Sequence, residues 1–121
     1  MAKDLQKAGA HFLGLKDMAG LLKPAAARQL IKALKEEVGL PIHFHTHDTS
    51  GIAGATILAA ADAGVDVVDT AMDAFSGGTS QPCMGSIVEA LHNSERDTGI
   101  NIENLRRHNM LYWRYFKSRP I

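Results

Sequence analysis

Short apolar runs of strand length alternate along this chain with longer segments of helical character. The strand-like runs are residues 11–15, 41–47 and 65–70. The helical segments are residues 24–38, 51–63, 85–93 and 102–117, and residues 3–8 read as the end of an earlier helix. Within 24–38 the apolar residues recur at spacings of three and four, which is the period of an amphipathic helix. Strands that alternate with helices in this way predict βα units around a parallel sheet.

Three such units are recognisably a piece of an α/β fold, but they are too few to close one. A complete (β/α)8 barrel typically takes about 250 residues, whereas this chain has 121. A sheet of three strands also leaves two edges without a partner, which favours association through those edges. The sequence therefore predicts an incomplete part of an α/β barrel.

Three histidines at alternate positions are the most informative chemical feature. His43, His45 and His47 are followed at once by Asp48 and a turn-like run. Successive side chains of a strand point to opposite faces, so the three imidazoles share one face. Two imidazoles so placed can bind one metal ion at roughly 2.0 to 2.1 Å. His45 and His47 lie nearest the carboxyl end and form the better pair; the alternative is that the histidines only hydrogen-bond within a tight barrel interior.

The carboxyl ends of parallel strands face a common site, and polar residues from all three predicted strands gather there. They are Lys16, Asp17, His45, His47, Asp48, Asp69, Thr70 and Asp73. A salt-bridged barrel mouth would use similar residues. Lys16 can be a metal ligand only if carbamylation by carbon dioxide turns its ammonium into an anionic oxygen donor, and an ion pair with Asp17 or Asp48 is the simpler expectation.

Charge and composition argue against several classes of function. Thirteen basic and thirteen acidic residues cancel without forming blocks, so we expect neither a nucleic-acid nor a membrane partner. No apolar run approaches the roughly 20 residues of a membrane span, and the single cysteine, Cys83, cannot form an internal disulfide; both features predict a cytoplasmic protein. Residues 51–55 lack the G-x-G-x-x-G fingerprint of dinucleotide binding. The loop 76–82 suits an anionic ligand or is a plain surface loop.

Three motifs carry a resemblance to a known family. They are Gly-Leu-Lys-Asp-Met-Ala-Gly-Leu-Leu-Lys-Pro at 14–24, His-Phe-His-Thr-His-Asp-Thr-Ser-Gly at 43–51 and Ser-Gly-Gly-Thr-Ser-Gln-Pro at 76–82. From about residue 3 to 107 the chain resembles the carboxyltransferase domain of pyruvate carboxylase, most closely the bacterial type. Related biotin-linked decarboxylase and carboxyltransferase subunits share parts of these motifs and are one alternative; a non-catalytic metal-binding remnant is another.

The resemblance implies a fold, a reaction and a set of ligands. It implies that residues 1–107 are part of a carboxyltransferase TIM barrel, about three βα units of its later half, and that 108–121 are a divergent tail. It assigns Lys16, carbamylated, as the catalytic residue and as a ligand, with His45 and His47, of zinc or manganese. The reaction would transfer the carboxyl group of carboxybiotin to pyruvate, giving oxaloacetate for gluconeogenesis and anaplerosis.

The same resemblance implies that much of the enzyme lies outside this chain. The family's fourth metal ligand, an aspartate of the first barrel strand, has no counterpart here, and no substrate-binding residue is assigned. Biotin would be carried by one further domain and ATP used by another, in a ligase whose full-length form is a homo-oligomer. We therefore expect the isolated chain to be inactive.

Overall fold

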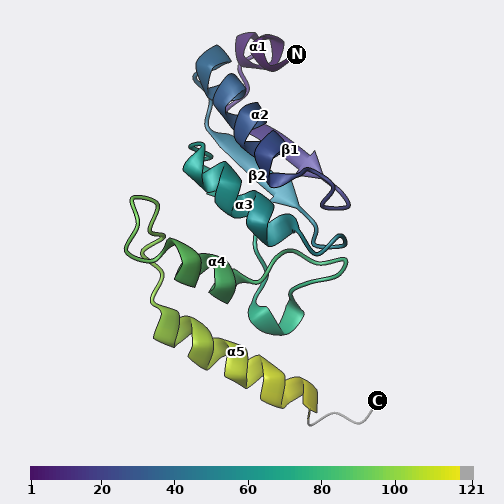
Figure 1. Cartoon of the computed structure of the whole chain (residues 1–121), viewed down its shortest axis with the longest axis vertical. Helices are drawn as coiled ribbons and strands as arrows, with labels where there is room; N and C mark the ends of the chain where they lie inside the picture. Colours follow the sequence, from purple (N-terminus) through teal and green to yellow (C-terminus); the bar gives the residue numbers. More distant parts are fainter. Residues whose placement is uncertain (118–121) are drawn as a thin grey trace.

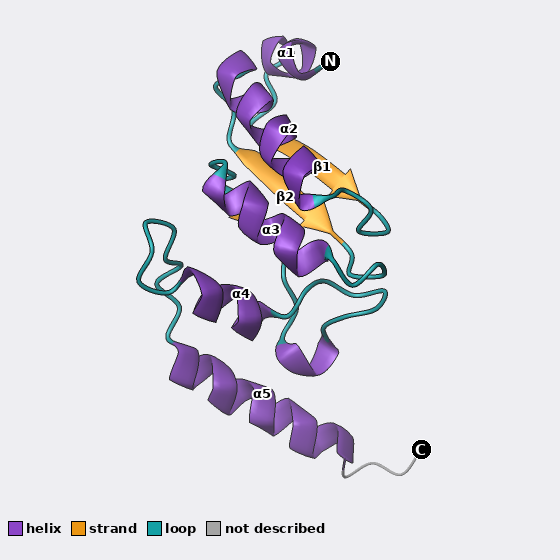
Figure 2. Ribbon diagram, viewed as in Figure 1, coloured by secondary structure: helices purple, strands orange, loops and turns teal. Residues whose placement is uncertain are grey.

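Three parallel strands, in the order β1-β2-β3, form a sheet that helices cover on one face (Figure 1). The computed structural model describes residues 1–117. The elements are α1 (Ala2–Lys7), β1 (Leu13–Asp17), α2 (Pro24–Glu37), β2 (Ile42–Thr46), α3 (Ala53–Asp62), β3 (Val67–Val68), the short 3-10 helix η1 (Asp73–Phe75), α4 (Met84–Leu91) and α5 (Ile102–Lys117). The predicted α/β class and parallel sheet are confirmed, and the sheet does not close into a barrel (Figure 2).

The central strand β2 divides the molecule into an apolar side and a polar side. Ile42, Phe44 and Thr46 are at most 1% exposed, whereas the histidines between them are partly exposed. Ile42 and Phe44 join an apolar core with side chains of α2, α3 and α4. Burial of each of these two large side chains contributes about 1.5 to 3 kcal/mol. The predicted alternation of β2 is therefore confirmed, and its apolar face is what holds the helices against the sheet.

Pairing with β2 sets the bounds of the other two strands. β1 was expected at residues 11–15 but runs from Leu13 to Asp17, in register with Ile42 to Thr46. That expectation is wrong by two residues because the apolar run does not decide where the backbone pairs. Lys16 and Asp17 consequently belong to the strand and not to the turn after it. β3 is only two residues long, although six were expected, and β2 is its one partner in the sheet among residues 1–117.

The helices lie within two residues of their predicted bounds, and α5 matches them. α5 packs on the rest of the chain through Leu105 and Asn109, which are 7% and 5% exposed. The Asn109 side-chain oxygen accepts a hydrogen bond from the backbone N–H of Asp73, at 3.0 Å. The boundary of a divergent tail at 108–121 stays a prediction, and its residues 118–121 lie outside the described part of the chain.

Gly20 closes the junction between the loop after β1 and the loop after β2. Its φ of +63° lies in the left-handed region, and a Cβ built there would lie 2.1 Å from the carbonyl oxygen of His47. The Ser50 hydroxyl donates a hydrogen bond to the Gly20 carbonyl. Both the backbone conformation and the close approach therefore require glycine.

We expect Gly20→Ala to lower the free energy of unfolding by about 2 kcal/mol or more, from left-handed strain and the clash with the His47 carbonyl. Urea unfolding followed by circular dichroism measures this loss. Gly39→Ala is the control, because a Cβ at Gly39 has no neighbour within 4 Å. Equal stability of the two variants would contradict the prediction.

Asp66 ties α2 to the sheet. Its Oδ2 accepts hydrogen bonds from the backbone N–H of Ile42, at 2.7 Å, and from the Lys35 ammonium, at 2.5 Å. Partial burial acts to raise the pKa of Asp66, but these two donors outweigh it and hold the pKa below the ordinary value of 3.8. The ionised carboxylate therefore stabilises the fold above that value, and this contribution is lost as the pH falls through the lowered pKa.

Asp66→Asn should remove this part of the acid sensitivity. We expect the variant to lose less stability than the wild type between about pH 5 and pH 3, by about 0.5 kcal/mol after allowance for solvent screening. Urea unfolding at several pH values measures the difference. Parallel curves for the two proteins would show that Asp66 contributes nothing to it.

Candidate metal centre

The polar face of the sheet carries a row of three residues, one from each strand segment. Lys16 of β1 is in register with His45 of β2. On the other side His43 pairs with Val67 and Phe44 with Val68, so the next residue, Asp69, lies beside His45. Residues in register on parallel strands point to the same face, so Lys16, His45 and Asp69 share one face with His43. Lys16, His45 and Asp69 are three of the eight residues that the sequence predicted to gather at the carboxyl ends of the strands.

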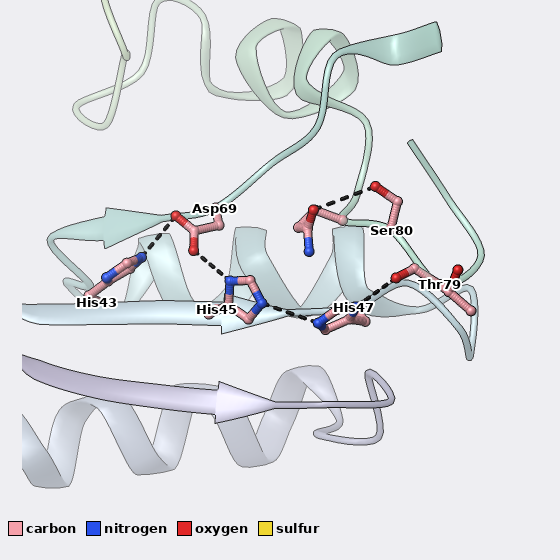
Figure 3. Close-up of polar contacts among 7 residues, drawn as sticks. His43, His45, His47, Asp69, Thr79 and Ser80 are labelled. Carbon is pink, nitrogen blue, oxygen red and sulfur yellow. Dashed lines mark hydrogen bonds and ion pairs between the residues drawn. The ribbon is translucent and has the colours of Figure 1, made fainter. Parts of the chain in front are cut away.

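One carboxylate binds two of the three histidines (Figure 3). Asp69 Oδ1 lies 2.8 Å from His43 Nε2, and Asp69 Oδ2 lies 2.6 Å from His45 Nδ1. All three side chains are about one-third exposed. Partial burial acts to raise the pKa of Asp69, but the hydrogen bonds from His45 and His43 together have a larger effect in the opposite direction. The pKa of Asp69 therefore lies below its ordinary value.

His47 is held by a different kind of acceptor. Its Nδ1 lies 2.7 Å from the carbonyl oxygen of Thr79, in the loop that follows β3 (Figure 3). A carbonyl oxygen can only accept, so His47 Nδ1 carries the proton, and the Asp69 carboxylate requires the same of His45 Nδ1. In the neutral rings both Nε2 atoms are therefore left with a free lone pair.

These two Nε2 atoms face each other at 3.1 Å (Figure 3). Two facing lone pairs repel unless a proton or a metal cation lies between them. Bonds of roughly 2.0 to 2.1 Å and ligand angles of about 90 to 110° place two nitrogens of one metal about 2.9 to 3.4 Å apart. The donor set and its spacing thus fit a divalent metal between His45 and His47. His43 differs from them because its Nε2, and not its Nδ1, is the atom bonded to Asp69.

Two imidazoles do not complete a coordination shell. Within residues 1–117, no third histidine, cysteine, aspartate or glutamate joins them in a group able to hold a metal. Lys16 is exposed and makes no hydrogen bond or ion pair with the described residues. The simpler expectation, an ion pair to Asp17 or Asp48, is wrong because Asp17 accepts two backbone N–H groups after β1 and Asp48 accepts one at the start of α3.

The loop 76–82 binds the segment after β2 through its backbone carbonyl groups, and its suitability for an anionic ligand stays a prediction. Its carbonyl oxygens accept from the segment after β2: Gly78 from Thr49 Oγ1 at 3.3 Å, Thr79 from His47 Nδ1 at 2.7 Å and Ser80 from Asp48 N–H at 2.8 Å. Sequence reasoning missed this role, because a backbone carbonyl has no signature in residue type. Asp73, expected at the site, instead accepts the Gly85 N–H at 2.8 Å where α4 begins.

Parallel βα units with polar side chains at the carboxyl ends of the strands are typical of (β/α)8-barrel enzymes, and comparison with known families agrees with such a barrel. The chain belongs to the family described as HMGL-like, which matches residues 1–111. Its relatives include pyruvate carboxylase 1 of Caenorhabditis elegans, 51% identical over 114 residues, and pyruvate carboxylase of Bacillus subtilis, 48% identical over 105 residues. These alignments cover 93% and 87% of this chain but only 10% and 9% of those proteins.

Solved structures support the same relationship. The carboxyltransferase domain of Rhizobium etli pyruvate carboxylase, solved with pyruvate and biocytin, is 69% identical, with a TM-score of 0.89 over 93% of this chain and 19% of that one. The resemblance seen in the sequence is therefore confirmed, and the chain corresponds to part of that domain's barrel. It spans about a tenth of the length of the curated relatives. None of the helices in residues 1–117 is long and apolar enough to cross a membrane.

Proposed function

We propose that this chain is the part of a pyruvate carboxylase carboxyltransferase domain that supplies most of the ligands of a divalent metal. In the whole enzyme the domain would move the carboxyl group of carboxybiotin to pyruvate, forming oxaloacetate. The observation that carries the proposal is the pair of Nε2 atoms of His45 and His47, 3.1 Å apart, with both Nδ1 atoms bound to acceptors. The 69% identity to a domain solved with pyruvate and biocytin supports the substrates.

Lys16 is the third ligand in this proposal. It is exposed, and strand register places it beside His45 on the same face. Its amine would add to carbon dioxide and lose one proton, and the resulting N-carboxylate supplies the anionic oxygen that zinc or manganese prefers over an ammonium. The fourth ligand then comes from a barrel strand outside these three.

The chain's own groups orient the site. His45 and His47 present Nε2 atoms whose direction the Asp69 carboxylate and the Thr79 carbonyl fix before any metal binds. A bound divalent metal supplies positive charge that stabilises the negative charge developing on the pyruvate oxygen. The biotin carrier and the ATP-using domain belong to other parts of the enzyme, and homo-oligomerisation and a cytoplasmic location stay predictions.

We expect the chain to bind Zn²⁺ through His45 and His47. His45→Ala and His47→Ala should each weaken the affinity by about 10-fold or more, because each removes one direct ligand. Competition with a chromophoric chelator measures the affinity. His92→Ala is the control, since His92 lies in another region and pairs with Asp97 at 3.2 Å. Unchanged affinity in both site variants would exclude the proposed centre.

The carboxyl transfer is tested in a complete barrel. We expect a chimera, in which residues 1–107 replace the matching segment of the Rhizobium etli domain, to transfer the carboxyl group of oxaloacetate to free biotin, the reverse reaction, with pyruvate as the measured product. Lys16→Ala and His47→Ala should abolish this activity in the chimera by removing metal ligands. The isolated chain should show no carboxyl transfer. If the isolated chain turned over at the rate of the chimera, the expectation that it is an incomplete enzyme would be refuted.

A further inference from the structure

Asp69 is placed by the backbone and not by its side-chain bonds. Its N–H donates to the carbonyl oxygen of Phe44, at 3.2 Å, which continues the pairing of β3 with β2 by one residue. Phe44 lies between His43 and His45, so the ladder places the Asp69 side chain between the two imidazoles (Figure 3). The carboxylate would thus face both rings even if no metal were bound.

The two carboxylate oxygens of Asp69 bind different histidines. Oδ1 accepts from His43 Nε2, and Oδ2 accepts from His45 Nδ1. Because the first bond holds the carboxylate in one orientation, the second oxygen is aimed at His45. An acceptor at Nδ1 is what keeps the proton of a neutral imidazole away from Nε2, the atom that faces His47.

We propose that Asp69, oriented by its hydrogen bond to His43, is the positioning residue of this site. Asp69 holds His45 in the tautomer whose Nε2 is free to bind a metal. The inference rests on the proposed metal centre and adds to it the residue that prepares one ligand. The corresponding partner of His47 is the backbone carbonyl of Thr79. Asp69 is therefore the one of the two Nδ1 acceptors that a side-chain substitution can remove.

Metal affinity tests the proposal first. Asp69→Ala should weaken Zn²⁺ binding about 10- to 100-fold, the usual cost of losing such a partner. Asp69→Asn should also weaken it, because the amide either donates to Nδ1 and inverts the tautomer or accepts without the carboxylate's charge. His43→Phe should cause a smaller loss of Zn²⁺ affinity, since it removes only the hydrogen bond that orients the Asp69 carboxylate.

Asp66→Asn is the matched control. Asp66 lies three residues earlier, its carboxylate is also hydrogen-bonded and partly exposed, and its partners are Lys35 and the Ile42 backbone. The control therefore removes one negative charge from the same segment without touching a histidine. We expect it to bind Zn²⁺ as the wild type does, and a loss equal to that of Asp69→Asn would overturn the positioning role.

Tautomer populations test the proposal without metal. Nitrogen-15 NMR of the imidazole rings in the metal-free chain should show His45 protonated at Nδ1 in the wild type and shifted towards Nε2 in Asp69→Ala. An unshifted tautomer would refute the inference even if affinity fell. If the wild type bound no Zn²⁺, the metal centre would fail, while this measurement would still decide what Asp69 does to His45.

Discussion

The pairing of β2 with a strand on each side is the constraint on which the rest of this structure depends. Parallel register sets which residues stand next to one another, and the two-residue period of a strand separates them onto two faces. One face buries Phe44 and its apolar neighbours against the helices. The other aligns Lys16, His45 and Asp69 in a row. A slip of one residue would place the imidazoles in the apolar core, so packing and chemistry are fixed by the same hydrogen bonds.

Aspartates join the elements around this sheet. Asp17, Asp48 and Asp73 each accept backbone N–H groups where a loop turns into the next element, and Asp66 links a helix to the start of β2. Such bonds to a charged acceptor are among the stronger ones in proteins, because the carboxylate is ionised and the donors would otherwise lose their partners. Asp69 uses the same chemistry towards two imidazoles. It alone among these five carboxylates is bound to the candidate ligands.

The open side of the sheet explains why the site is only partly built. Parallel sheets are normally covered on both faces, yet here the face with the histidines is about one-third exposed, and the outer edges of β1 and β3 are unpaired within the described residues. In a closed barrel that face would point inward, and further strands would add ligands from the missing side. In the proposed function, His45, His47 and Lys16 would be the part of the metal centre that this chain supplies, and the rest of the barrel would complete it.

The sequence by itself determined the succession of strands and helices and the shared face of the three histidines, because periodicity and residue type are local properties. The choice of His45 and His47 as a ligand pair stays a prediction. The sequence also carried the family resemblance through its three motifs. Tertiary structure decided where β1 begins, since pairing and not apolarity sets strand bounds. It also decided that Asp69 binds His45 while Asp17 and Asp48 do not pair with Lys16. The Thr79 carbonyl that orients His47 comes from a residue 32 positions away, and only the folded chain brings these two groups together.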